Sequence, residues 1–329
     1  MVVKLDLKDK KILYELDRNS RQPASKIAKN VGLSTDGTNY RIKRLVKNEA
    51  IFRFITLLNT AKLGLTTYKL FYRFQNTTPE NESEIIQYMV NHPNTQLVTE
   101  TQGVFDLNVN FIVPNIESLH KIITEVRLKY GEFLADKEVT IMVQSHFFYR
   151  SYLLNKKLTN TREKVYYGSD AKVVPLDRQN KQILTLLAKD ARVSAVDIAR
   201  EIGLSSDAVI HRIKKLEHEK IIQDYLLFLN PEKIGYTWYY VMVKFRDLTG
   251  DKENKFFQFC NIQPNIWNYT STIGPWECVF NVDVESDEHL KQILTEIKKD
   301  FSQVLREYSI IKIIKTHKFN QYPMGADKS

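Results

Sequence analysis

Apolar residues recur at helical spacing over the first fifty residues of this 329-residue chain and alternate with polar residues over the next hundred. Asp6 precedes apolar residues spaced three and four apart, which predicts an N-cap and a first helix. A polar break at residues 19–23 leads to a second helix that stops at Gly32, where a left-handed residue can end it. Ser34 is expected to cap a third helix, whose buried stripe is Thr38, Ile42 and Leu45.

From residue 68 onward, strand-like runs and helical stripes follow one another in the order βαββαβ. We expect strands at 52–59, 68–74, 96–101, 106–113 and 138–147 and helices at 82–90 and 118–130. This order is typical of a ferredoxin-like antiparallel sheet with both helices on one face. The other face needs a partner, and we expect it to be formed by alternate residues, namely Leu70, Tyr72 and Phe74 and, further along, Val241, Val243 and Phe245.

The whole pattern occurs twice. A shift of 171 residues aligns residues 5–64 with 176–235 at about 23 identities in 60, without a gap. Two copies are too few for a solenoid, so each should form a unit with its own cores, and the nearest partner for each open sheet is the other copy. The expected fold class is α+β, with two tandem copies of a helix-turn-helix (winged-helix-like) module plus a ferredoxin-like βαββαβ domain.

The repeat fixes the expected domain boundaries. The helix-turn-helix domains should span 1–50 and 176–221, and the ferredoxin-like ligand-response and dimerisation domains should span 51–150 and 222–321. A polar linker is expected at 151–175 and a tail at 322–329. With this arrangement, the two copies would form an intramolecular pseudo-dimer.

The net charge of +9 is concentrated in the expected helical modules and in the expected linker, where residues 151–175 hold 5 Lys and Arg against 2 Asp and Glu. Residues 1–50 hold 12 Lys and Arg against 6 Asp and Glu, and residues 176–220 hold 9 against 7. The longer segments 51–150 and 221–329 are nearly neutral, at 9 against 10 and 13 against 14. Segregated positive charge on a helix-turn-helix module favours double-stranded DNA as the partner, with the third helix in the major groove.

Position along each third helix predicts the role of its outward residues. Residues near the N-terminus should reach base edges, and the long cations further along should contact phosphates. The expected DNA-binding residues are Ser34, Thr35, Asn39, Tyr40, Arg41, Lys43 and Arg44 in copy one and Ser205, Ser206, Ile210, His211, Arg212, Lys214 and Lys215 in copy two. The alternative is that these are solvated charges on an exposed helix. Because Asn39-Tyr40 corresponds to Ile210-His211, we predict unequal half-sites and an asymmetric operator.

Several motifs recur in the same order in both copies and resemble the Lrp/AsnC (feast/famine) family of transcription regulators. In copy one they are Leu5-Asp6-x-x-Asp9, Ile27-Ala28, Gly32-Leu33-Ser34, Arg41-Ile42-Lys43-Arg44-Leu45 and Leu58-Asn59-x-x-Lys62-Leu63-Gly64. The resemblance implies a DNA-binding regulator that dimerises through its ferredoxin-like domains and often assembles further, so a homo-oligomer is also possible. Glu49 and Lys220 depart from the family, which usually has glycine there, so we expect the connection to follow another path.

The resemblance also implies an amino-acid or related small-metabolite effector bound near the hairpin between the two central strands. The corresponding candidate ligand residues are Gly103, Asp106, Gly274 and Glu277. The second hairpin, Gly274-Pro275-Trp276-Glu277, departs from the family's Gly-x-x-Asp pattern. The alternative for both sites is a glycine that serves the hairpin structurally.

Other classes of protein are disfavoured. The two cysteines, Cys260 and Cys278, lack the spacing of a disulfide framework or a zinc site, so neither a metal nor a cofactor is expected. No apolar run could span a membrane and no signal peptide is evident, so we expect a cytoplasmic protein. One rival is an enzyme like the siroheme-decarboxylase subunits that share this architecture, although 57–64 and 228–235 hold no histidine or arginine. Another rival is a protein-interaction module that does not bind DNA.

Overall fold

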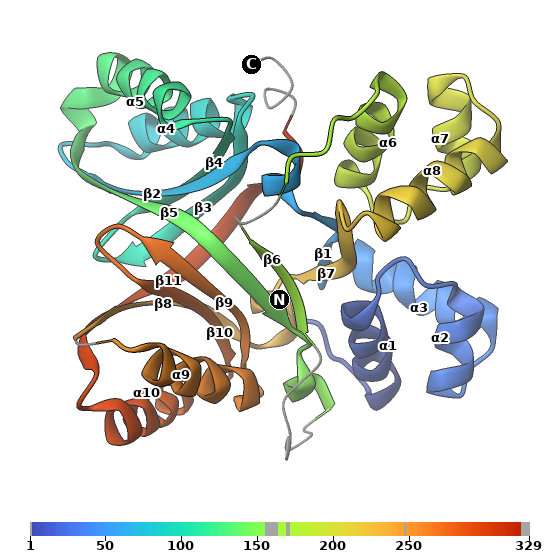
Figure 1. Ribbon diagram of the computed structural model, residues 1–329. Helices are drawn as coiled ribbons and strands as arrows, with labels where there is room; N and C mark the ends of the chain where they lie inside the picture. Colours follow the sequence, from blue (N-terminus) through green and yellow to red (C-terminus); the bar gives the residue numbers. More distant parts are fainter. Residues whose placement is uncertain (1, 155–163, 169–171, 247, 324–329) are drawn as a thin grey trace.

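The computed structural model describes residues 2–154, 164–168, 172–246 and 248–323. It has two parts: a β-barrel flanked by helices and, on one side of it, a pair of helical heads (Figure 1). Head 1 contains α1 (Leu7–Arg18), α2 (Ala24–Val31) and α3 (Thr35–Lys47). Head 2 contains α6 (Arg178–Lys189), α7 (Ala195–Ile202) and α8 (Ser206–His218).

The predicted helix boundaries in the heads are confirmed. Asp6 and Ser34 are the N-caps of α1 and α3, and Asp177 and Ser205 are the N-caps of α6 and α8. Gly32 ends α2 in the left-handed region at φ 72°, a conformation in which glycine has no Cβ penalty. The buried stripe of α3 is Thr38, Ile42 and Leu45, as its spacing predicts.

The barrel is built from the ferredoxin-like part of each copy. Copy one contributes β2 (Thr66–Phe74), α4 (Pro79–Asn91), β3 (Thr95–Gly103), β4 (Leu107–Val113), α5 (Ile116–Tyr130) and β5 (Leu134–Phe148). Copy two contributes β8 (Thr237–Phe245), α9 (Gly250–Ile262), β9 (Ile266–Ile273), β10 (Cys278–Val284), α10 (Asp287–Phe301) and β11 (Leu305–Phe319). Both copies have the predicted βαββαβ order.

The two sheets are joined at both edges. The strand order is β2-β4-β3-β11-β8-β10-β9-β5, and β5 also pairs with β2, which closes the ring. The long strands β5 and β11 make these joins, because each pairs with its own sheet along one half and with the other sheet along the other half. Gly103 pairs with Ile311 across one join, and Ile273 pairs with Ile141 across the other. Closure leaves no open sheet edge between the copies.

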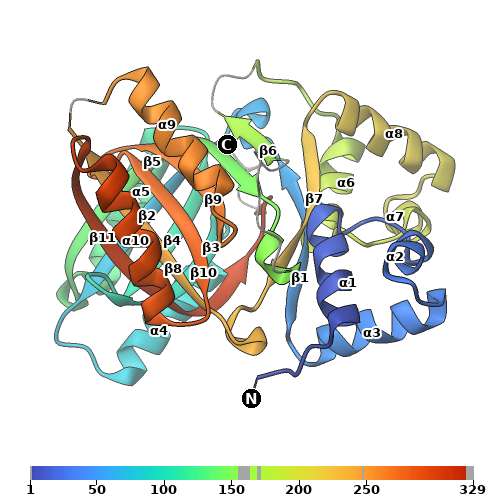
Figure 2. The same ribbon diagram turned by 90° about the horizontal axis from the view of Figure 1, so that it is seen from below.

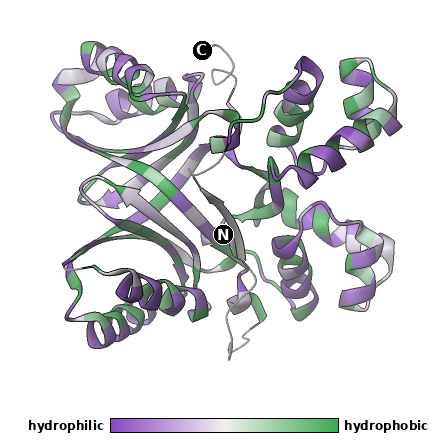
Figure 3. Ribbon diagram, viewed as in Figure 1, coloured by the Kyte–Doolittle hydropathy of each residue, from purple (hydrophilic) through white to green (hydrophobic). Residues whose placement is uncertain are grey.

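The expected assignment of sheet faces is wrong. Leu70, Tyr72 and Phe74 pack under α4 and α5, and Val241, Val243 and Phe245 pack under α9 and α10. The opposite face, with Phe71, Tyr240 and Met242, lines the barrel interior and meets the other copy. Both faces of these strands are largely apolar, so alternation alone did not distinguish the helix-covered face from the interior. Figure 3 shows hydrophobic residues in the barrel strands mixed with hydrophilic ones.

A two-stranded ribbon connects the barrel to the heads. It consists of β1 (Ile51–Leu58) and β7 (Ile222–Leu229), which pair antiparallel, one from each copy. Short 3-10 turns, η1 (Thr60–Leu63) and η4 (Glu232–Ile234), follow these strands, and η2 (Gly131–Phe133) precedes β5. The expected polar linker is in part structured: η3 (Ser151–Leu154) follows β5, and β6 (Lys164–Gly168) pairs with β5 at residues 144–148. Residues 155–163, 169–171 and 324–329 of the expected linker and tail lie outside the described residues.

Candidate nucleic-acid interface

The N-terminal part of α3 presents polar and aromatic side chains to solvent. Thr35, Asn39 and Lys43 are exposed, and Tyr40 retains 68% of its surface. Tyr40 is therefore not packed in the core of the head, and its ring and hydroxyl are accessible to a partner. Ser34 is engaged as the helix cap, because its Oγ accepts from the Gly37 amide at 3.0 Å.

The corresponding surface of α8 has different chemistry. His211, Lys214 and Lys215 are exposed, and Ile210 retains 40% of its surface. Ser206 is half-buried, and Ser205 caps the helix by accepting from the Ala208 amide. The two recognition surfaces therefore differ where base edges would be read: one offers an amide and a phenol, the other an aliphatic side chain and an imidazole.

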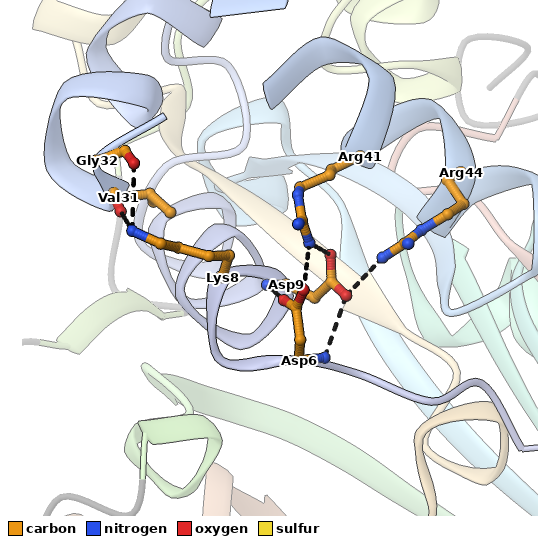
Figure 4. A network of polar contacts seen from close by, with 7 residues as sticks. All are labelled: Asp6, Lys8, Asp9, Val31, Gly32, Arg41 and Arg44. Carbon is orange, nitrogen blue, oxygen red and sulfur yellow. Dashed lines mark hydrogen bonds and ion pairs between the residues drawn. The ribbon is translucent and has the colours of Figure 1, made fainter. Parts of the chain in front are cut away.

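Three arginines expected to contact phosphates form hydrogen bonds and ion pairs inside the heads. Arg41 donates to Asp6 at 2.7 Å and to Asp9 at 2.8 Å, and Arg44 donates to Asp9 at 2.5 Å (Figure 4). In head 2, Arg212 donates to Asp177 at 2.7 Å and to Asn180. In this structure the three guanidiniums fix the third helix to the start of the first helix in each head, and the phosphate role of Arg41, Arg44 and Arg212 stays a prediction.

The local electrostatics agree with this structural role. The Asp9 backbone amide and the Arg41 guanidinium hold the pKa of Asp6 below its usual value. Asp6 and Asp9 raise the pKa of Arg41 in turn. In the same network, the Lys8 Nζ donates to the carbonyls of Val31 and Gly32 at the end of α2 (Figure 4). The N-terminus of α1 therefore ties together the other two helices of head 1.

The exposed cations that remain on the third helices are lysines. Within the described ranges, no ion pair involves Lys43, Lys47 or Lys214. Lys215 lies 3.8 Å from Glu219, one turn along α8. The positive charge that the third helices present to solvent is therefore carried mainly by these lysines, because the neighbouring arginines have intramolecular partners.

The turn after each third helix is left-handed despite the missing glycine. Glu49 has φ 59° and Lys220 has φ 56°. The Ala50 amide then donates to Leu45 O and the Ile221 amide to Leu216 O, both at 3.0 Å, as in a Schellman motif. The expectation of another path is therefore wrong: the chain keeps this turn, and the bonds that follow compensate for the strained residue.

Reciprocal contacts join the two heads. Arg21 donates to the carbonyls of Ala191 and Val193 in head 2, and Arg192, its counterpart in the repeat, donates to the carbonyls of Ser20 and Gln22 in head 1. We call this pair of interactions the arginine clasp. Two half-buried guanidiniums on backbone carbonyls hold the heads at a defined separation.

Each head also packs on the strand of the other copy. Leu227, Leu229 and Ile234 of copy two lie in the core of head 1, and Leu58, Leu65 and Ile112 of copy one lie in the core of head 2. Figure 2 shows α3 and α8 at opposite ends of the pair of heads, with α2 and α7 between them. The pair of heads as a whole lies on the side of the β1–β7 ribbon opposite the barrel.

The four candidate ligand residues serve the barrel. A Cβ on Gly103 would come 2.9 Å from Ile310 O, and one on Gly274 would come 2.7 Å from Val139 O. The Asp106 carboxylate accepts from the Phe74 amide at 2.7 Å, and Glu277 accepts from the Phe245 amide at 3.0 Å. Gly103 and Gly274 admit the other copy's strand, and Asp106 and Glu277 cap β2 and β8. These contacts agree with the structural alternative, and a ligand-binding role for the four residues stays a prediction.

The histidines at the shared repeat position have separate partners. The His146 ring packs 4.6 Å from the Phe257 ring, and His317 Nε2 lies 2.9 Å from Glu100. Among the described residues, no group of three His, Cys, Asp or Glu side chains could hold a metal. No helix in the described ranges has the length and apolarity to cross a bilayer.

Comparisons with known proteins agree with this geometry. Residues 176–217 match the AsnC-type helix-turn-helix domain, and residues 5–51 match a winged helix-turn-helix DNA-binding domain. The HTH-type transcriptional regulator LrpA of Pyrococcus horikoshii is 44% identical over 62 residues, which cover 19% of this chain and 44% of that protein. The chain thus spans less than half the length of this relative.

Longer matches extend into the barrel domains. An HTH-type transcriptional regulator of Pyrococcus furiosus is 30% identical over 122 residues, which are 37% of this chain and 81% of that protein. The Bkd operon transcriptional regulator of Pseudomonas aeruginosa is 31% identical over 121 residues, 36% of this chain and 79% of its own. The siroheme decarboxylase NirDL has a similar fold, with a TM-score of 0.60 at 12% identity, and the alignment covers 96% of this chain and 94% of that one. The chain belongs to the Lrp/AsnC family of helix-turn-helix transcriptional regulators.

Proposed function

We propose that this protein is a sequence-specific regulator that binds double-stranded DNA as an intramolecular pseudo-dimer. Residues 1–50 and 176–221 would bind DNA, and 51–150 and 222–321 would hold the two copies together and respond to a small-molecule effector. The observation that carries the proposal is the pair of heads, joined by the arginine clasp and the β1–β7 ribbon, with two exposed and different third helices.

The heads support an asymmetric operator. In a homodimer, identical recognition helices read identical half-sites about 34 Å apart, one turn of the duplex. Here Asn39 and Tyr40 would read one half-site, and Ile210 and His211 the other. Asn is suited to adenine and an aliphatic side chain to the thymine methyl group, so the two half-sites would differ in sequence.

The proposal is for a regulator rather than an enzyme. The cavity inside the barrel, between the two copies, has a volume of about 70 Å³. Pockets that hold drug-sized ligands measure roughly 300–1,000 Å³, so this space is small for a tetrapyrrole. The likeness to NirDL at 12% identity is a likeness of fold, which does not carry the reaction over to this chain.

Salt dependence of binding tests the DNA proposal. We would measure the affinity of the full chain for a labelled pool of random duplexes at several salt concentrations, and repeat it with the Lys43→Ala/Lys47→Ala variant. Each lost phosphate contact should reduce the slope of log affinity against log salt by about 0.9, so the double variant should lose about 1.8. Lys121→Ala, on the exposed surface of α5, is the matched control and should leave the slope unchanged. Absence of binding at low salt, or equal slopes in all three proteins, would refute the proposal.

A further inference from the structure

A cavity of about 70 Å³ lies inside the barrel, between the two copies. Copy one lines it with Lys69, Gln96 and Asn110, and copy two faces them with Trp238, Tyr240 and Trp267. Both copies also contribute other aromatic and polar side chains, so its wall is mixed, a combination common in small-ligand sites. It is separate from the hairpin of Gly103 and Gly274.

Lys69 is the unusual member of this wall. It is 6% exposed, and its Nζ lies 5.7 Å from the centre of the Tyr240 ring. In the described part of the chain no carboxylate forms an ion pair with it, and the ionisable group near enough to act on it is the buried Cys278 thiol. Burial lowers the pKa of Lys69 to about 8, so it is charged at neutral pH. An ammonium buried without a counterion is costly, which points to a missing anion.

The other polar groups of the cavity have partners. Arg150 forms ion pairs with Asp17 at 2.6 Å and Asp283 at 3.4 Å, so its charge is neutralised. The Gln96 amide donates to Gln321 at 3.0 Å, and Trp238 Nε1 donates to Asn281 at 2.8 Å. Lys69 is thus the one cationic side chain in this described lining whose charge is not balanced by a carboxylate.

The sequence differences between the two copies explain why the cavity holds one unbalanced ammonium and not two. The counterpart of Lys69 in the repeat is Tyr240, so a single ammonium faces an aromatic ring across the pseudo-symmetry axis. A homodimer would place two lysines there, and like charges at this depth would repel strongly. Arg150 is likewise matched by Gln321, and Asp17 by Ala188. The cavity is therefore asymmetric and suited to one anion.

We propose that this cavity binds one short-chain carboxylate, whose carboxylate group pairs with the Lys69 ammonium and whose carbon chain lies against Trp238 and Trp267. A volume of about 70 Å³ holds on the order of five waters at 10–15 Å³ each, which matches a ligand of about four to six non-hydrogen atoms. The proposal identifies the chemistry of the effector in the proposed function. The cavity also borders Arg150 and Asp17, and Asp17 belongs to α1, so the occupant would lie beside a contact that holds head 1.

Thermal unfolding of the full chain tests the proposal without DNA, so its failure is distinct from failure of DNA binding. Acetate, propionate, butyrate and pyruvate would each be titrated, with propionamide as the neutral counterpart of propionate. At least one carboxylate should raise the unfolding midpoint in a saturable way, and propionamide should not. Above pH 8 the affinity should fall about tenfold per pH unit as Lys69 loses its proton.

Two variants make the assignment specific. Lys69→Met keeps the length of the side chain and removes its charge, and it should weaken carboxylate binding at least tenfold while remaining folded. Lys121→Met makes the same exchange on the exposed surface of α5 and should bind like the unchanged chain. Binding by none of the four carboxylates, equal binding of propionamide, or full binding by Lys69→Met would overturn the proposal.

Discussion

Replacing Lys69 by methionine should make the protein more stable at neutral pH. The ordinary pKa of a lysine is 10.5, and burial in the barrel lowers that of Lys69 to about 8. A pKa difference of one corresponds to about 1.4 kcal/mol, so the charged ammonium costs the folded state about 3 kcal/mol at pH 7. Lys69→Met removes this cost and leaves a flexible apolar chain of similar length among aromatic rings.

The stabilisation by Lys69→Met should depend on pH, because the folded and unfolded chains lose the Lys69 proton at different pH values. Between pH 8 and 10.5 the unfolded chain keeps the proton on Lys69 while the folded chain has lost it, so the stability of the unchanged protein rises with pH. The stabilising effect of Lys69→Met should therefore be about 3 kcal/mol at pH 7 and close to zero near pH 10.5. For a domain of about 200 residues this corresponds to a shift in Tm of about 5–10 °C at pH 7.

The assay is thermal unfolding of both proteins, without added carboxylate, at pH 7 and pH 10.5. Lys121→Met serves as the control, because that side chain is 68% exposed and the exchange should change stability by less than about 0.5 kcal/mol. A Tm for Lys69→Met at or below that of the unchanged protein at pH 7 would refute the reasoning. The same increase at both pH values would also refute it, because the gain would then come from packing and not from charge.

The strained turns, the close strand contacts and the arginine clasp yield three further predictions. Lys220→Gly should stabilise head 2 by about 1 kcal/mol in urea unfolding, because it replaces a strained left-handed residue with glycine. Glu49→Gly should stabilise head 1 by less, because it also removes the ion pair with Lys233. Destabilisation by Lys220→Gly would contradict this prediction. Gly274→Ala should lower the stability of the barrel by about 1–3 kcal/mol, because the new Cβ would lie 2.7 Å from Val139 O. Gly250→Ala is the control and should be tolerated, because its Cβ would have no atom within 4 Å. Equal effects of the two variants would contradict the argument that the strands approach closely at Gly274. Arg21→Ala should weaken binding to a duplex with both half-sites at least tenfold and leave binding to a single half-site unchanged. Arg200→Ala, on the exposed face of α7, is the control and should change neither affinity. If Arg21→Ala weakened binding to both duplexes equally, the arginine clasp would not set the spacing of the heads.

Local signals predicted the heads and the order of elements well. Caps at Asp6 and Ser34, the left-handed Gly32 and the stripe of α3 depend on neighbours within four residues, so spacing alone identifies them. The barrel order followed from alternation and breaks in the same way. The inward face of each sheet did not, because residues on both sides of β2 and β8 are apolar and only the tertiary partners distinguish them.

The site was predicted less completely, because its charges find partners far along the chain. Arg41 lies more than thirty residues from Asp6, and nothing local indicates that the guanidinium points back to α1 and not out to a phosphate. Asp9 at the third position of the first helix was a usable signal, since it makes Asp6-x-x-Asp9 a capping box with an unused acidic oxygen. Arg21 and Arg192 at matching repeat positions were a second signal for a symmetric contact, although its target carbonyls appear only in three dimensions.

The central claim is that two different heads in one polypeptide read two different half-sites of one duplex. Selection of bound sequences from a random duplex library by the full chain tests it most directly. The account predicts an asymmetric consensus, with two unlike half-sites about one helical turn apart, in which Asn39→Ala/Tyr40→Ala relaxes one half-site and leaves the other intact. A palindromic consensus, or no enrichment of any sequence, would contradict it.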